Sequence, residues 1–173
     1  MGGTVDFVEY DENWVKSFEI EKHILTDVFH DILIKVEHFG STSVPGLSAK
    51  PIIDMFVFVC DNSDIDSYND IMKSYGYEAR GEQELTECMV FVKHKANSNT
   101  RTHKVNLCKE NNEFSANALL FRDYLRIDKD AREKYQKLKK ELARKYHDDP
   151  IAYGNGKRDC VAEILEEAKD YFG

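Results

Sequence analysis

One carboxylate stands inside an otherwise apolar segment of the sequence. The segment spans residues 52–59, and its only charged member is Asp54. An ionised carboxylate is costly to bury in a strand unless a cation, a metal ion or a polar cleft compensates for the lost water. The residue type and its setting therefore predict that Asp54 belongs to a functional site, as a catalytic residue and a metal ligand.

The loop before this strand carries groups that suit a phosphate. A glycine lets the backbone approach a ligand closely, three consecutive hydroxyl-bearing residues offer the materials of an anion-binding nest, and a lysine adds positive charge. These residues are Gly40, Ser41, Thr42, Ser43 and Lys50. Together they suit a phosphate chain, with Asp54 placed to hold a divalent ion such as Mg²⁺ against it. The alternative is an ordinary Ser/Thr turn that ends at Pro45-Gly46.

The loop and the strand also resemble a known family. Residues 37–47 and 49–54 are similar to the signature of the GrpB-like family, a branch of the nucleotidyltransferase superfamily. Shorter matches follow along the chain at Gly76-Tyr77, Arg101-Thr102-His103, residues 121–126, Tyr135, Leu138-Lys139, Tyr153 and Lys157. The resemblance implies one α+β domain over residues 1–173, a nucleotidyltransferase-like mixed β-sheet packed with helices and a helical C-terminal region. It also implies binding of a nucleotide or another phosphorylated small molecule, and it leaves open whether a nucleotidyl group is transferred.

The metal motif of that superfamily is incomplete here. The motif places two carboxylates two residues apart on one strand, because such residues share a face and hold two metal ions together. Asp54 is present, but its partner position is Phe56, and Lys104 and Asn106 stand where relatives often carry His-x-His. An ammonium cannot bind a cation, and an amide binds one weakly. The alternatives are therefore a nucleotidyltransferase with one metal ion and a non-catalytic nucleotide-binding or regulatory module.

Five further residues are candidates for phosphate binding: Arg101, His103, Lys104, Arg122 and Lys157. Strand alternation predicts that Lys104 and His103 lie on opposite faces unless a bulge intervenes. Arg122 suits either a structural ion pair or bidentate phosphate binding. Lys157 is a candidate for phosphate binding because of the resemblance to the family. A hydrolase built on His38 and a serine of the loop is a third alternative, although no orienting acid stands at a recognisable spacing.

Composition narrows the classes of function. The chain has 173 residues, 42% hydrophobic and 32% charged, which is typical of a soluble globular domain. A net charge of −8 argues against general binding to nucleic acids or membrane surfaces. No apolar run approaches the ~20 residues needed to cross a membrane, and residues 1–6 lack a signal-peptide pattern. The four cysteines are dispersed, which predicts reduced and mostly buried thiols and a cytoplasmic location.

Hydrophobic periodicity and turn residues predict the elements that position these groups. The expected strands are residues 34–39, 52–59, 77–80, 89–94 and 103–108. The expected helices are residues 14–29, 65–75, 116–127, 131–146 and 160–171, with breaks at Asp149-Pro150 and Gly154-Asn155-Gly156. The basic run from Arg122 to Lys145 is expected to form a solvated helix face.

Overall fold

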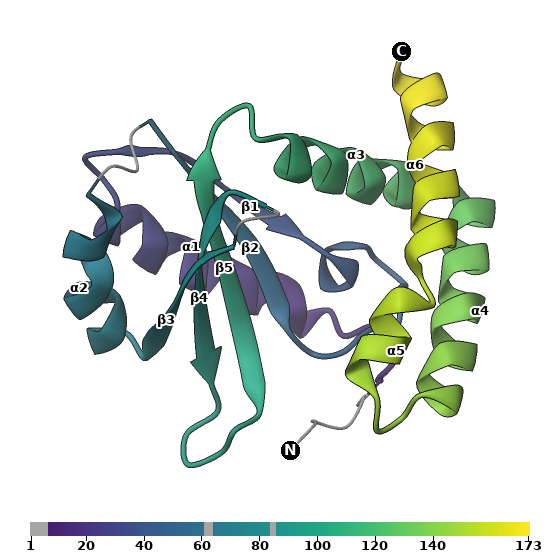
Figure 1. Ribbon diagram of the computed structural model, residues 1–173, viewed down its shortest axis with the longest axis horizontal. Coiled ribbons are helices and arrows are strands. Elements are labelled where there is room, and N and C mark those ends of the chain that lie inside the picture. Colours follow the sequence, from purple (N-terminus) through teal and green to yellow (C-terminus); the bar gives the residue numbers. More distant parts are fainter. Residues whose placement is uncertain (1–6, 61–63, 84–85) are drawn as a thin grey trace.

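A five-stranded mixed β-sheet organises the chain (Figure 1). The structure is a computed structural model and describes residues 7–60, 64–83 and 86–173. The strand order is β1-β2-β5-β4-β3, with β2 and β5 parallel and the other neighbours antiparallel. The strands are β1 Leu33–Phe39, β2 Ile53–Val59, β3 Tyr77–Gln83, β4 Cys88–His94 and β5 Arg101–Lys109.

The parallel strands in the middle of the sheet set the position of the carboxylate. All residues of β2 except Asp54 are buried, which fits an apolar strand covered on both faces. The register places Asp54 beside Phe39 of β1 and Lys104 of β5. The carboxylate therefore lies at the start of β2, next to the point where β1 ends.

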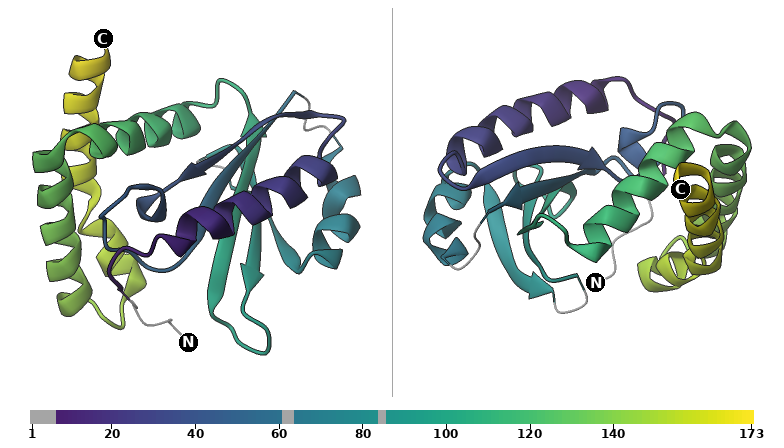
Figure 2. Two further views of the ribbon diagram at one scale, coloured as in Figure 1. Left: turned by 180° about the vertical axis from the view of Figure 1, so that it is seen from behind. Right: turned by 90° about the horizontal axis from the view of Figure 1, so that it is seen from above.

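Helices cover both faces of the sheet and extend beyond it (Figure 2). α1 packs on one face, α3 packs on the opposite face, and α4, α5 and α6 gather beside the loop that follows β1. The helices are α1 Asn13–Val28, α2 Asn69–Ser74, α3 Glu113–Ile127, α4 Lys129–Lys145, α5 Pro150–Asn155 and α6 Arg158–Phe172. The loop after β1 is thus enclosed between the sheet and the C-terminal helices.

Side-chain alternation along β2 divides the core into two layers. Met55 and Val57 face α1 and pack with Phe18 and Leu25, whereas Phe56 and its neighbour Phe58 form a second cluster with α3. A third cluster joins the C-terminal helices to the loop. One face of β2 therefore packs against α1, and the other packs against α3.

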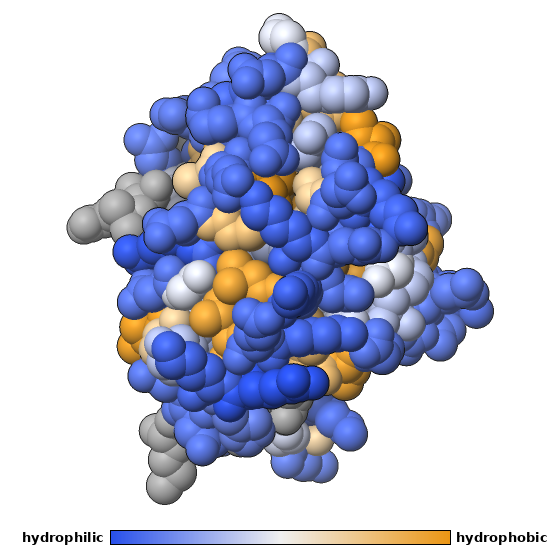
Figure 3. Space-filling view, turned by 90° about the vertical axis from the view of Figure 1, so that its right-hand side faces the viewer, coloured by the Kyte–Doolittle hydropathy of each residue, from blue (hydrophilic) through white to orange (hydrophobic). Residues whose placement is uncertain are grey.

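α3, α4 and α5 begin at side-chain caps that their sequences provide. Asn112, Asp128 and Asp149 each accept a hydrogen bond from the backbone N–H three residues later. The outward face of the C-terminal helices is largely hydrophilic, with scattered apolar side chains (Figure 3). The solvated face expected for the basic run is confirmed by the exposure of residues such as Lys137 and Arg144.

The expected elements are confirmed with several corrections. The helix expected over residues 65–75 is a 3₁₀ turn, Ile65–Tyr68, followed by the short helix α2. The breaks expected at Asp149-Pro150 and Gly154-Asn155-Gly156 coincide with helix boundaries, but the residues between them form a short helix that was not expected, α5. Proline is favoured in the first turn of a helix, and Asp149 caps that turn.

Two further expectations concern the burial of the cysteines and the lack of membrane-spanning helices. Cys88 and Cys108 are buried as expected, but Cys60 is exposed. Within residues 7–60, 64–83 and 86–173, no helix has the length and apolar character to cross a membrane. Residues 1–6, considered above for a signal peptide, lie outside the described residues.

Candidate functional site

Gly40 brings the loop against the carboxylate of Asp54. Its φ of +72° lies in the left-handed region, which favours glycine. A Cβ atom at this position would lie 2.8 Å from Asp54 Oδ2, closer than real Cβ contacts allow. Both the backbone conformation and the close approach therefore require glycine at the end of β1.

The three hydroxyls of the loop have different partners. Thr42 Oγ1 donates to the carbonyl oxygen of Ile52 at 3.1 Å, and Ser43 Oγ donates to that of Gly40 at 2.6 Å. Ser41 Oγ instead lies 2.9 Å from Lys139 Nζ, and Ser41 lines a cavity. Two hydroxyls thus hold the turn together, and the third, that of Ser41, joins the loop to α4 beside the cavity.

His38 has the structural role that is usual for a histidine at a strand end. Its Nε2 lies 3.0 Å from Thr42 Oγ1, and its ring stacks on Phe18. Because Thr42 donates elsewhere, Nε2 carries the proton and donates. Burial lowers the pKa of His38 to about 3, helped by the charges of Arg126 and Arg122. A hydrolase built on His38 gains no support from this arrangement, since Nε2 is already engaged with the loop.

Asp54 is half-buried and surrounded by positive charge without touching it. Among the described residues, no hydrogen bond or ion pair joins its side chain to another group. Burial raises the pKa of Asp54 to about 6, and the more distant charges of Lys104, Arg101 and Lys157 oppose the rise. A share of the carboxyl groups is therefore protonated near neutral pH.

The position that would supply a second carboxylate belongs to the apolar core. Phe56 is fully buried and stacks on Phe39, with ring centroids 3.8 Å apart. In the part of the chain that the structure describes, no three His, Cys, Asp or Glu side chains gather as a metal site. Lys104 occupies the neighbouring position on β5. One carboxylate beside an ammonium does not fit a resident Mg²⁺ ion, which needs several oxygen ligands.

Two lysines of the C-terminal helices converge near the loop. Lys139 of α4 is 1% exposed, and its Nζ also donates to the carbonyl oxygen of Ser48 at 2.6 Å. Lys157, at the start of α6, lies over the ring of Tyr153. Burial and the charge of Lys157 lower the pKa of Lys139 to about 7. Burial and the charge of Lys50 also lower the pKa of Lys157, while Asp54 opposes this effect.

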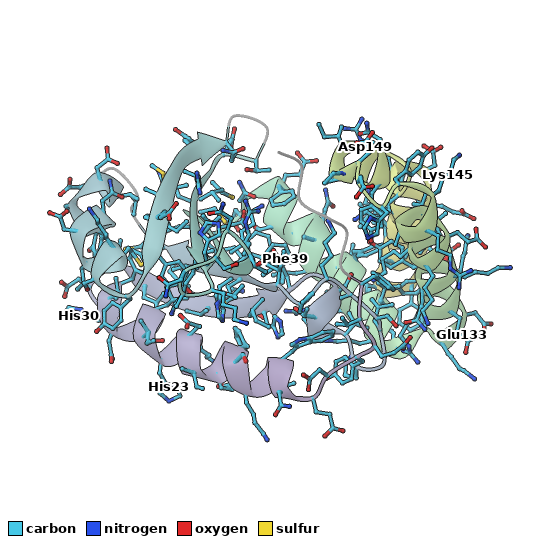
Figure 4. The ribbon with its side chains drawn as sticks, turned by 90° about the horizontal axis from the view of Figure 1, so that it is seen from below. His23, His30, Phe39, Glu133, Lys145 and Asp149 are labelled. Atoms are coloured by element: carbon cyan, nitrogen blue, oxygen red, sulfur yellow. The ribbon has the colours of Figure 1, made fainter. Side chains whose placement is uncertain are left out.

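A cavity of about 440 Å³ opens beside the loop. The remaining walls are mostly apolar, and the polar groups come from Gly40, Ser41, Asn117, Arg122, Tyr135 and Lys157. The apolar wall residues include Phe39, Phe114, Phe121, Leu125 and Val161. Phe39 lies between the sheet and the C-terminal helices (Figure 4). A polar cavity is expected from the sequence, whereas the structure forms an apolar cavity with a cationic edge because α3 and α6 turn apolar faces toward it.

Of the candidates named from the sequence, Gly40, Ser41, Arg122 and Lys157 line this cavity, whereas Asp54, Thr42, Ser43 and Lys104 do not. Arg122 lines it, but its guanidinium donates to Glu37, Asp123 and the carbonyl oxygen of His38, which is the structural ion pair considered above. His103 lies on the opposite face of the sheet from Lys104, as alternation predicts, and its Nε2 is 3.9 Å from Glu21.

Arg101 and Lys50 lie at the margin of the site. Arg101 is exposed at the start of β5 and acts on Asp54 through its charge. Lys50 lies over the ring of Tyr153, on which Lys157 also packs. Tyr153 therefore stands between two of the lysines named as candidates.

Lys139 belongs to the Leu138-Lys139 match to the GrpB-like family, but the sequence alone does not indicate its role in the site. The signal for it is its spacing: Ala131, Tyr135, Lys139 and Ala143 recur every four residues and are all buried. A lysine within the buried stripe of a helix needs a polar partner. Its partners here are Ser41 and the backbone at Ser48.

Comparison with known proteins identifies the family. A family model described as GrpB protein matches residues 4–167. The chain belongs to the GrpB family. YqkA of Bacillus subtilis is 36% identical over 165 residues, which cover 95% of this chain and 47% of YqkA. Glutamate-rich protein GrpB of Alkalihalophilus pseudofirmus is 34% identical over 167 residues, covering 95% of this chain and 96% of that protein. The chain thus spans about half the length of YqkA and nearly all of the second relative.

Solved structures confirm the fold. The crystal structure of conserved protein GrpB from Enterococcus faecalis has a TM-score of 0.88 and 35% sequence identity, covering 97% of this chain and 100% of that one. A structure of the Cid1 poly(U) polymerase with Mg 3′-dATP bound has a TM-score of 0.58 and 16% identity, covering 86% of this chain and 49% of that one. The GrpB fold of this chain is therefore nucleotidyltransferase-like. At that identity, the similarity to Cid1 concerns the fold alone.

Proposed function

We propose that this GrpB protein is a nucleotide-binding module, which takes a nucleotide or another phosphorylated small molecule into the cavity and lacks two-metal nucleotidyl transfer. The observation that carries the proposal is the excess of cations around one carboxylate. Lys104, Arg101 and Lys157 act on Asp54, and Lys50 repels Lys157. Like charges held together in half-buried surroundings destabilise one another, so an anionic ligand would relieve the repulsion.

The cavity suggests how such a ligand lies. Its phosphates would meet the loop at Gly40 and Ser41 and the ammonium of Lys157. A base or another apolar group would lie among the rings of Phe114 and Phe121, since flat aromatic walls suit stacking. The ligand class is therefore one with an anionic end and an apolar or aromatic end.

The metal ligands available around Asp54 favour nucleotide binding over nucleotidyl transfer. Phe56 leaves Asp54 as the one carboxylate on its strand face, and Lys104 disfavours a second cation beside it. A divalent ion would accordingly be carried by the phosphates of the ligand. Calorimetry with Mg²⁺ alone should show little heat, and tight binding of two ions without nucleotide would overturn this view. The dispersed cysteines support the accompanying proposal of a cytoplasmic location.

Titration calorimetry with nucleotides tests the proposal. The panel contains UTP, ATP, GTP and CTP, the matching monophosphates and the uncharged nucleosides, each with and without Mg²⁺. We expect affinity to rise with the number of phosphates, and Lys157→Met to weaken triphosphate binding about 10-fold or more. The matched control is Lys169→Met on the same helix, where the lysine is exposed and pairs with Glu166.

Two outcomes would contradict nucleotide binding. One is the absence of heat with every phosphorylated compound at millimolar concentration. The other is equal weakening by Lys157→Met and Lys169→Met, which would show a general charge effect. Release of pyrophosphate by the wild-type protein, lost in Asp54→Asn, would instead favour a nucleotidyltransferase with a single acidic ligand.

A further inference from the structure

Ser41 and Lys139 form a pair that phosphate binding does not explain. Lys139 is 1% exposed, and its Nζ lies 2.9 Å from Ser41 Oγ and 2.6 Å from the carbonyl oxygen of Ser48. Ser41 is half-buried and lines the cavity. A hydroxyl beside a cavity, with a lysine amine in hydrogen-bonding distance behind it, has the arrangement of a nucleophile and its general base.

We propose that Ser41 and Lys139 are a serine–lysine catalytic dyad that hydrolyses carboxylic esters with an apolar acyl group. Lys139 Nζ donates both to Ser41 Oγ at 2.9 Å and to the carbonyl oxygen of Ser48 at 2.6 Å. A neutral amine can keep the hydrogen bond to Ser48 and turn its lone pair toward Ser41 Oγ, so that the same 2.9 Å contact lets it accept the hydroxyl proton of Ser41.

Two features of the surroundings favour the neutral form of Lys139. Its side chain is buried, and Lys157 is close enough for the two charges to repel. These effects lower the pKa of Lys139 to about 7, so an appreciable share of the amine is unprotonated at neutral pH. The ionisable groups that face it are Tyr135, whose phenol stays protonated because burial raises its pKa, and Lys157.

The cavity supplies the other requirements of ester hydrolysis. Phe114, Phe121 and Leu125 provide an apolar wall for the acyl group. Lys157 lines the same cavity as Ser41 and supplies a positive charge that would stabilise an oxyanion formed there. The substrate class is thus an ester with an apolar acyl chain, and the reaction needs water and no other co-reactant.

Lys139 accepts and returns one proton in each half of the reaction. Ser41 Oγ forms a bond to the acyl carbon while its proton passes to Lys139 Nζ, and the ester C–O bond then breaks as the alcohol leaves with that proton. Water next adds to the acyl carbon and gives a proton to Lys139. Ser41 Oγ recovers this proton when its bond to carbon breaks. Ester and water become acid and alcohol, and both residues return to their starting states.

A fluorophosphonate probe tests the dyad directly. Attack by Ser41 Oγ breaks the P–F bond, releases fluoride and leaves a stable phosphonate ester that peptide mass spectrometry locates. We expect labelling at Ser41, and we expect its rate to rise with pH through about 7 as Lys139 loses its proton. Hydrolysis of p-nitrophenyl butyrate should follow the same pH profile.

Matched variants separate catalysis from structure. Ser41→Ala and Lys139→Met should each slow labelling and hydrolysis by about 10²-fold or more, with Ser98→Ala and Lys137→Met as controls because both residues are exposed. If Lys139→Met fails to fold, Ser41→Ala and the wild-type pH profile still decide the question. Ser41→Ala should keep the thermal stability of the wild type within a few degrees.

Three results would overturn the dyad. They are no labelling of folded wild-type protein, labelling at another residue, and a labelling rate that is independent of pH between 5 and 9. Each of these leaves the calorimetric test of nucleotide binding unaffected, because that test measures heat with nucleotides and no covalent chemistry. The two proposals therefore fail separately.

Discussion

Two buried or half-buried carboxylates lie on opposite faces of the sheet, and their surroundings differ. Glu21 of α1 is 5% exposed; it accepts a hydrogen bond from Tyr77 Oη at 2.8 Å and forms an ion pair with Lys93 at 2.7 Å. Asp54 has cations nearby but, within the described residues, no direct partner. The carboxylate of Glu21 has direct partners within the protein, whereas Asp54 has only nearby charges that act on it.

This difference separates a structural polar cluster from a candidate site. A buried carboxylate with full partners fastens α1 to the sheet, since Tyr77, Lys93 and His103 come from three different strands. A carboxylate without partners raises the free energy of the folded protein unless something binds. We attribute this cost at Asp54 to the proposed binding site, because Lys157 both acts on Asp54 and lines the cavity.

Phe56→Asp should have the largest effect, because it would place a second carboxylate on the strand face of Asp54. The change removes a fully buried ring from its stack with Phe39 and buries a charge, so we expect a loss of at least about 4 kcal/mol in the free energy of unfolding. Urea unfolding measures it. Phe172→Asp is the control, since Phe172 is 48% exposed and should change stability little. A stable Phe56→Asp protein that binds two metal ions would show that the site accepts two-metal chemistry after all.

Glu21→Ala should have the next largest effect on stability, because it removes the carboxylate that pairs with Tyr77 and Lys93. Lys93 and Tyr77 would lose their partner in a buried setting, which should cost about 3 kcal/mol. The measurement is again urea unfolding, with the exposed Glu19→Ala on the same helix expected to stay within about 0.5 kcal/mol. Equal effects of the two substitutions would remove the contrast between Glu21 and Asp54.

Asp54→Asn should change stability in the opposite direction. The folded pKa of about 6 lies above the ordinary value of 3.8, so the folded protein binds more protons between these values and loses stability as the pH rises through them. The amide does not ionise, so the variant should be more stable than the wild type by about 3 kcal/mol above pH 6 and equal to it below pH 4. Thermal unfolding across pH 4–8 measures this. A destabilised variant at pH 7 would show that Asp54 has a partner in the folded protein.

Much of this contrast is visible in the sequence. The charged residue inside an apolar strand, the glycine and hydroxyl loop before it and the missing carboxylate at Phe56 are local features, and local patterns predict strands and turns well. Strand alternation also places His103 and Lys104 on opposite faces, as the register confirms.

Other features depend on long-range packing that no local pattern contains. The pairing of Ser41 with Lys139 joins residues 98 positions apart, and Glu21 meets Lys93 across 72 positions. The apolar walls of the cavity come from α3 and α6, whose placement depends on the loops between the C-terminal helices. The sequence could therefore supply the polar residues of the site but not the shape or apolar character of the space that they face.

Lys104→Met should have the smallest effect and sharpens the electrostatic side of the comparison. Lys104 lies beside Asp54 across β2 and β5, and its charge is the strongest influence that opposes the rise in the pKa of Asp54. Removing it should raise the pKa of Asp54 further, which a carboxyl ¹³C NMR titration would follow, with a stability change below about 1 kcal/mol. The window in which stability falls with rising pH should extend upward accordingly. Lys109→Met, an exposed position on the same strand, should leave the titration of Asp54 in place. If both variants give the wild-type titration, burial alone sets the pKa of Asp54, and the cations around it act on a ligand rather than on the carboxylate.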